Sequence, residues 1–244
     1  MKIKPRHLTA GTVASLIAIT ILVAGLTFGP KHITVAQTAT GDPELAGHLA
    51  QHAPKGAHNL AAAVVDSDGA VKFAGLGADE NTEFEIGSVS KTFTAELLRQ
   101  AVERGEVTLD TTVGEILDDA DMSTSDITLK ELATHTSGLP RILGISAFAV
   151  AISMQRKQNP YDGFTTQRIL DKARTATLTD RGTYNYSNFG MALLGHLLAR
   201  RAGTTYAQLA QERIFTPLGM SNTYVMTPET TPANAPRGLD ITGH

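Results

Sequence analysis

Apolar and polar positions along the chain predict a β-hairpin near residue 65. Leu60 to Val65 and Ala70 to Ala74 form apolar runs on either side of Asp66-Ser67-Asp68-Gly69, a turn-rich cluster. Two apolar runs joined by such a turn are typical of an antiparallel hairpin. A two-stranded sheet is marginal in water, and no clear strand follows, so we expect this chain to lack strands that would complete the sheet.

Helical spacing of apolar residues dominates the remainder of the chain. A helix is expected to begin near Ser88, and Gly105 is placed to end it. Its apolar positions are Phe93, Leu97, Leu98, Ala101 and Val102. Further segments that allow one apolar face are Glu44 to Gln51, Leu129 to Thr134, Ser146 to Arg156, Thr165 to Arg174, Asn188 to Ala202 and Tyr206 to Ile214. The pattern therefore predicts an α+β protein, with a hairpin of an incomplete sheet and a large helical region.

The N-terminal segment has the pattern of an export signal. Lys2, Lys4 and Arg6 precede the uncharged, apolar stretch from Gly11 to Phe28, and small residues follow at Thr34-Val35-Ala36. We interpret residues 1–36 as a signal peptide cleaved after Ala36, or as a retained N-terminal membrane anchor. Residues 37–43 read as a linker. Either reading places the remainder outside the cytoplasm, secreted or anchored to the membrane.

Composition excludes several classes of function. The 21 basic and 24 acidic side chains are interspersed, with a formal net charge of -3, so no basic stripe is available for nucleic acid. The chain has no cysteine, which excludes a disulfide, a thiolate nucleophile and a cysteine metal site. No two histidines stand at a recognised metal spacing, so we expect no metal and no cofactor.

Candidate nucleophilic chemistry begins with Ser88-Val89-Ser90-Lys91. Residues three apart face the same side of a helix, so the Ser88 hydroxyl and the Lys91 ammonium can approach each other. A serine hydroxyl becomes an effective nucleophile when a neighbouring base takes its proton. The pattern alone leaves open that Ser88 is only a helix N-cap and Lys91 a solvated side chain.

A second candidate segment is Tyr186-Ser187-Asn188. Alternate side chains of an extended loop point the same way, so the Tyr186 phenol and the Asn188 amide can enter one site. A phenol near cations has a lowered pKa and can act as a base. The alternative is that Tyr186 is a packed aromatic and Asn188 an N-cap; the two roles are compatible.

These motifs together resemble the serine beta-lactamase and penicillin-binding-protein family of hydrolases. Tyrosine at the head of the second motif is similar to the branch of class C beta-lactamases, D-alanyl-D-alanine carboxypeptidases and related esterases. His135-Thr136-Ser137-Gly138-Leu139-Pro140 and Pro217-Leu218-Gly219-Met220 resemble further landmarks of the family. The resemblance runs from about Glu44 to Val225, and it implies a domain over residues 44–225 followed by an irregular tail over 226–244.

The resemblance implies a role for each site residue. Ser88 would be the acylated nucleophile, Lys91 its charge partner, Tyr186 the general base and Asn188 the substrate-orienting amide, while His135 to Pro140 look structural. The family's third motif, Lys-Thr-Gly or His-x-Gly, has no match after Met220, and Ile241-Thr242-Gly243 resembles only its ending. In the family that strand supplies one oxyanion-hole donor, whose loss costs about 100- to 1000-fold in rate.

We therefore expect an exported serine hydrolase that forms an acyl-enzyme on Ser88 and acts on a beta-lactam, a D-alanyl peptide or an ester. A truncated, weakly active or inactive relative is one alternative. A non-enzymatic envelope protein that binds peptidoglycan stems or a partner through the same cleft is another. We expect a monomer whose partner is a small-molecule or peptidoglycan-derived substrate, together with the membrane if the N-terminal segment is retained.

Overall fold

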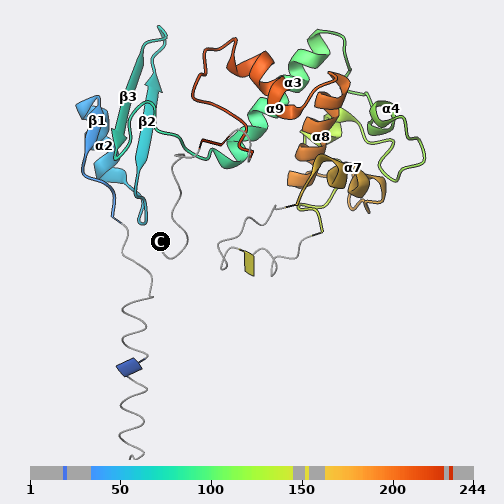
Figure 1. The fold of residues 1–244 in the computed structure, drawn as a ribbon, viewed down its shortest axis with the longest axis horizontal. Coiled ribbons are helices and arrows are strands. Elements are labelled where there is room, and N and C mark those ends of the chain that lie inside the picture. The colour runs from blue at the N-terminus through green and yellow to red at the C-terminus, as the bar shows by residue number, and fades with distance from the viewer. Residues whose placement is uncertain (1–18, 21–33, 145–151, 154–162, 228–230, 233–244) are drawn as a thin grey trace, which may run out of the picture. The chain divides into compact units, whose positions relative to one another are not determined.

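The computed structural model describes residues 19–20, 34–144, 152–153, 163–227 and 231–232 (Figure 1). The chain divides into two compact units, one made of Met1–Thr82 with Arg237–His244 and the other of Glu83–Pro236. The first unit carries the described strands and the second is helical, which confirms the predicted α+β class. Each unit has its own architecture.

The first unit is a small antiparallel sheet with the strand order β1-β3-β2. Its strands are β1 (Ala39–Gly41), β2 (Leu60–Val65) and β3 (Val71–Leu76). The predicted hairpin is present, with Val65 paired to Val71 beside the turn, and its second strand extends two residues beyond the predicted Ala74. The Asp66 N–H donates to the Ala70 carbonyl at 2.8 Å and closes the turn.

Strand β1 lies inside the segment that the composition predicts to be a linker. It pairs with β3 over three residues, and Gly41, at φ 75°, ends it. A β-carbon at Gly41 would overlap the Phe73 carbonyl oxygen, so the close approach of the two strands requires glycine here. Three residues are too few to show an alternating pattern, which explains why the strand is not apparent from the sequence.

Helix α2 (Pro43–His52) covers one face of this sheet. Asp42 caps it by accepting a hydrogen bond from the Leu45 N–H at 2.9 Å, and Pro43 occupies its first position. Ala46 of the helix is buried, as are Ala74 and Leu76 of β3. The arrangement matches the predicted helix from Glu44 to Gln51, extended by one residue at each end.

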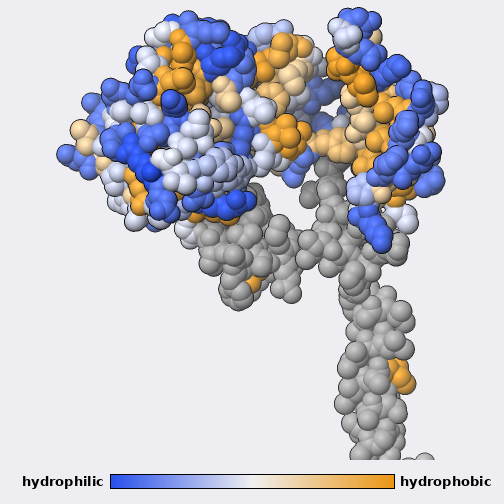
Figure 2. Space-filling model, turned by 180° about the vertical axis from the view of Figure 1, so that it is seen from behind, coloured by the Kyte–Doolittle hydropathy of each residue, from blue (hydrophilic) through white to orange (hydrophobic). Residues whose placement is uncertain are grey.

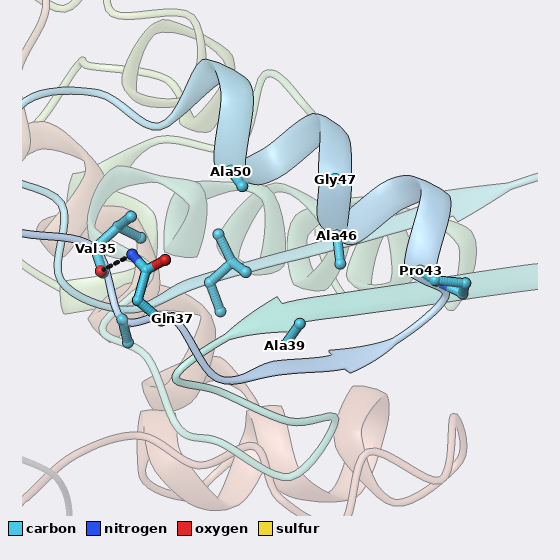
Figure 3. Close-up of a pocket in the computed structure, with 9 residues that line it drawn as sticks. Val35, Gln37, Ala39, Pro43, Ala46, Gly47 and Ala50 are labelled. Atoms are coloured by element: carbon cyan, nitrogen blue, oxygen red, sulfur yellow. Dashed lines mark hydrogen bonds between the residues drawn. The ribbon is translucent and has the colours of Figure 1, made fainter.

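A small pocket lies beside α2 within the sheet unit (Figure 3). Its lining includes Val35, Gln37, Ala39 and Ala46, and the Gln37 side-chain amide donates to the Val35 carbonyl at 3.1 Å. The lining is mostly apolar and includes none of the predicted site residues. The predicted site residues Ser88, Lys91, Tyr186 and Asn188 all lie in the helical unit.

The helical unit is built around α8 (Asn188–Arg201), which contacts five other helices among the residues that the structure describes. Those neighbours are α3 (Ser90–Glu103), α4 (Val113–Leu117), α5 (Leu129–Ala133), α7 (Thr166–Arg174) and α9 (Tyr206–Ala210). Leu193, Leu194 and Leu197 are fully buried. A helix with neighbours on several sides is apolar around most of its circumference, as α8 is, and forms the core of its unit.

Where the structure describes a predicted helix, prediction and structure agree apart from the helix ends, and one described helix was not predicted. The Tyr206 segment continues beyond α9 as a π-helical turn, η2 (Gln211–Phe215). Most of the predicted helix from Ser146 to Arg156 lies outside the described residues. Helix α4 was not predicted, although Thr112 and Glu115 form a capping box at its start, a signal that is readable in the sequence.

Apolar surface is exposed on both units. Val65 and Val71 are more than half exposed at the tip of the hairpin, and Leu218 is similarly exposed in the helical unit. Orange surface interrupts the polar surface of both units in the face shown in Figure 2. Singly exposed apolar side chains are ordinary on proteins, so they do not locate a site by themselves.

Candidate active site

Ser88 lies in a tight turn directly before α3. The turn is the 3-10 helix η1 (Gly87–Val89), and α3 begins two residues after Ser88. Residues three apart lie on the same side of a helical turn, so the Lys91 side chain, from the first turn of α3, can approach Ser88. The Lys91 Nζ donates to the Ser88 Oγ at 3.2 Å. The short contact that the Ser-x-x-Lys spacing predicts is therefore formed.

Tyr186 reaches the same hydroxyl from 98 residues away. Its phenol donates to the Ser88 Oγ at 2.7 Å, and the Lys91 Nζ lies 5.0 Å from the centre of its ring. Ser88 is exposed, and Lys91 and Tyr186 are half-buried. The structure thus brings a hydroxyl, an amine and a phenol together at a site open to solvent.

The loop that carries Tyr186 is held by the segment His135–Arg141. The Thr179 N–H of the Tyr186 loop donates to the Gly138 carbonyl at 2.9 Å, and the Gly182 N–H donates to the Thr136 carbonyl at 2.8 Å. The Ser187 hydroxyl donates to the Pro140 carbonyl at 2.8 Å and accepts from the Gly190 N–H at 2.8 Å, which caps α8. The loop is therefore fixed both to a neighbouring segment and to the central helix.

An ion-pair cluster holds the start of this loop. The Arg181 guanidinium donates to the Glu131 carboxylate at 2.7 Å and to the Asp126 carboxylate at 2.6 Å. Hydrogen bonding to Arg181 is the largest cause that lowers the pKa of Glu131 to about 2. Glu131 also closes the capping box of α5 with Thr128, so the cluster ties the loop to a helix end.

Positive charge surrounds the Tyr186 phenol. Hydrogen bonding to Lys91, and then to Ser88, lowers the pKa of the phenol, and the charges of Lys91 and Arg141 act in the same direction. The Arg141 guanidinium lies 4.9 Å from the centre of the Tyr186 ring. A nearby cation favours the phenolate over the neutral phenol, so at a given pH a larger fraction of Tyr186 is ionised than of a solvated tyrosine.

Asn188 is half-buried and opens α8. Its backbone N–H donates to the Arg141 carbonyl at 2.9 Å. Within the part of the chain that the structure describes, its side-chain amide makes no hydrogen bond to Ser88, Lys91 or Tyr186. The structure therefore assembles three of the four predicted site residues by direct contact, and places Asn188 two residues from Tyr186 with its amide outside that hydrogen-bonded group.

Two neighbours of the phenol were not predicted to lie there. Arg141 directly follows the His135–Pro140 landmark, and the His135 ring lies 4.6 Å from the Tyr186 ring, centre to centre. Neither contact has a signal in the local pattern, because the two segments are about fifty residues apart.

Two further predicted segments lie largely or wholly outside the residues that the structure describes. Ile241-Thr242-Gly243 and nearly all of the apolar N-terminal stretch lie outside the described residues. Among the residues that are described, no helix has the length and apolar character needed to cross a membrane.

Comparison with known proteins shows the family of the chain. The family model described as Beta-lactamase matches residues 46–241. The chain belongs to the beta-lactamase family. A curated beta-lactamase of Pseudomonas fluorescens is 32% identical over 168 residues, which cover 67% of this chain and 42% of the relative. The predicted serine beta-lactamase and penicillin-binding-protein family is thereby confirmed.

Solved structures of this family share the fold. A class C beta-lactamase from Rhodobacter sphaeroides has 30% sequence identity and a TM-score of 0.52, with 66% of this chain and 44% of that chain covered. A beta-lactamase/D-alanine carboxypeptidase from Pseudomonas syringae has 26% identity and a TM-score of 0.57, with 70% and 47% covered. The chain spans less than half of the length of these relatives.

Proposed function

We propose that this protein is a serine hydrolase in which Ser88 attacks the carbonyl carbon of its substrate. The observation that carries the proposal is the Ser88 hydroxyl, which contacts the Tyr186 phenol at 2.7 Å and the Lys91 amine at 3.2 Å. A hydroxyl within hydrogen-bond reach of a base and a cation has the arrangement of an activated nucleophile. Membership of a serine hydrolase family supports the same reading.

The proposed reaction has two stages. The Ser88 Oγ forms a bond to the carbonyl carbon while its proton passes to the Tyr186 phenolate, and the phenol then protonates the leaving group as the bond to that group breaks. Water next attacks the acyl carbon, loses a proton to the phenolate and releases Ser88 with its proton restored. Lys91 stabilises the phenolate, and Asn188 orients the substrate carbonyl.

Beta-lactams, D-alanyl peptides and esters are the proposed substrate classes, since each presents a carbonyl with a leaving group on nitrogen or oxygen. The relative from Pseudomonas syringae is described as both a beta-lactamase and a D-alanine carboxypeptidase. We further propose that the protein acts outside the cytoplasm, because positive charges precede an apolar stretch at its N-terminus.

Covalent labelling tests the proposal. The protein is incubated with a fluorescent penicillin and, separately, with a fluorophosphonate, and the adduct is located by mass spectrometry. We expect one label on Ser88 that is abolished in Ser88→Ala. Ser90→Ala is the matched control, because Ser90 is an exposed serine two residues away that contacts neither Lys91 nor Tyr186 in the described hydrogen bonds. Absence of label from a folded protein, or a label that persists in Ser88→Ala, would contradict the proposal.

A further inference from the structure

His135 contacts the chain on both sides of Tyr186. Its backbone carbonyl accepts a hydrogen bond from the Asn185 N–H at 2.8 Å, and its Nδ1 accepts one from the Ser187 N–H at 3.2 Å. Asn185 and Ser187 are the two neighbours of Tyr186 in the sequence. One residue therefore fixes the backbone amides immediately before and after the phenol.

The imidazole ring also supports the phenol directly. The rings of His135 and Tyr186 lie 4.6 Å apart with an angle of 36° between their planes, and the Tyr184 ring meets the imidazole edge-on at 5.9 Å. These contacts use the face of the Tyr186 ring and leave its hydroxyl directed to Ser88. The ring contact thus constrains the phenol without competing for its oxygen.

The hydrogen bond to Ser187 determines which form of His135 is present. A nitrogen that accepts an N–H carries no proton, so the neutral imidazole must hold its proton on Nε2. Burial, followed by the charge of Lys91, lowers the pKa of His135 and keeps the ring neutral. The charged and titratable groups described around it are Lys91, Tyr184 and Tyr186. A protonated ring could not accept the Ser187 N–H.

The backbone of His135 adopts a conformation that histidine does not favour. Its φ is 59°, in the left-handed region, at the residue that follows the C-cap of α5. Glycine or asparagine usually occupies this place because a β-carbon is strained there. A residue held in strain persists where its surroundings determine the conformation, and such residues gather at functional sites. The His135 side chain therefore offsets this strain with contacts that glycine could not make, namely the hydrogen bond to Nδ1 and the ring contact with Tyr186.

We propose that His135 is a positioning residue for Tyr186, acting through the amides of Asn185 and Ser187 and through its ring contact with the phenol. The inference rests on the proposed base role of Tyr186. A residue that only stabilised the loop would affect folding and leave the phenol unchanged. A positioning residue also sets the distance from the phenol to Lys91 and Ser88, and therefore its ionisation and reactivity.

Three variants separate the two contacts made by the His135 side chain, which are the hydrogen bond from the Ser187 N–H and the ring contact with Tyr186. His135→Phe keeps a ring and removes the acceptor, His135→Asn keeps an acceptor and tolerates positive φ, and His135→Gly removes both and relaxes the backbone. The matched control is His196→Asn, a half-buried histidine on α8 whose ring contacts Thr166. Circular dichroism and thermal unfolding report whether each variant folds.

Two measurements follow Tyr186 without requiring turnover. The 13C resonance of its phenol carbon, assigned with Tyr186→Phe, is titrated to obtain its pKa, and 15N spectra report the tautomer of His135. In the wild type we expect a pKa below the ordinary value of about 10 and an Nε2-protonated ring. In the Phe and Gly variants the pKa returns towards that value, whereas in the Asn variant it stays near the wild type.

The rate of Ser88 labelling gives the third measurement. We expect about a 100-fold loss in the Phe and Gly variants, a smaller loss in the Asn variant and none in the control, because small misplacements of a catalytic group cost rates of that order. An unchanged phenol pKa with unchanged labelling in the Phe and Gly variants overturns the proposal. A His135 ring that is protonated on Nδ1 in the wild type also overturns the proposal, and this result does not depend on whether any variant folds. A wild type that is never labelled refutes the proposed function, while the two spectra still decide the role of His135.

Discussion

Replacing Tyr186 with phenylalanine removes one oxygen atom and tests the proposed base most directly. The lost group is the phenol oxygen that lies 2.7 Å from the Ser88 Oγ. The ring contacts with His135 at 4.6 Å and with the Arg141 guanidinium at 4.9 Å do not need that oxygen. The substitution therefore separates proton transfer from packing.

The two consequences differ in size. General acid–base catalysis by a positioned side chain contributes about 100- to 10,000-fold in rate, which corresponds to about 3 to 5 kcal/mol in the activation barrier. The lost hydrogen bond contributes only about 0.5 to 1.5 kcal/mol to the free energy of unfolding, and Ser88 is exposed, so water replaces the phenol as its partner. We expect a large loss of acylation rate with a nearly unchanged melting temperature.

The assay follows acylation by a fluorescent penicillin or a chromogenic ester at several pH values, with unfolding measured in parallel. Because the surroundings lower the phenol pKa, the wild-type rate rises with pH through a value below 10 as the phenolate forms. In Tyr186→Phe this rise is lost. A Phe variant that acylates within about threefold of the wild type, far less than the minimum expected for a base, would refute the reasoning and move the base role to Lys91.

Two further predictions concern stability. Arg181→Ala removes the partner that lowers the pKa of Glu131 to about 2. Because the unfolded carboxyl has its pKa near 4.5, this pair stabilises the fold fully above that pH and less as the pH falls towards 2. The variant should therefore unfold more readily than the wild type at pH 7 and lose less stability on acidification. Equal slopes of the unfolding free energy against pH in the two proteins would contradict this. Gly41→Ala should destabilise the sheet unit by at least about 1 to 2 kcal/mol, since alanine is strained at positive φ and its β-carbon meets the Phe73 carbonyl. The effect is measured by hydrogen exchange of the β1 and β3 amides. Unchanged protection of these amides would show that the strands tolerate the side chain.

Local pattern was sufficient for elements that depend on near neighbours in the chain. The hairpin of β2 and β3 was predicted because its turn and both apolar runs are adjacent. The start of α8 at Asn188 was predicted, but its N-cap is Ser187, whose hydroxyl accepts from the Gly190 N–H, and not Asn188 as the sequence suggested. Strand β1 was not predicted, because three residues have no measurable period and the strand exists only by pairing with β3.

The candidate site likewise combines a contact between near neighbours in the chain, which was predictable, with contacts between distant segments, which depend on the fold. Ser88 and Lys91 are three residues apart, so elementary helix geometry predicts their contact, and the tighter turn of η1 changes only its detail. Tyr186 came from a motif and a family resemblance, while its distance from Ser88 depends on the whole helical unit. Arg141 was not predicted at all as a neighbour of the phenol.

The sequence alone determined the chemical groups that are available, their local spacing and the family to which the chain belongs, because these depend on residue identity and on a few neighbouring backbone angles. Tertiary structure alone decided that a phenol from a loop before α8 meets a hydroxyl before α3, and that the ring of His135, a residue with a positive backbone φ, contacts that phenol ring. Contacts between distant segments arise from the packing of helices around a shared core, and that packing sums many weak interactions that no short pattern encodes.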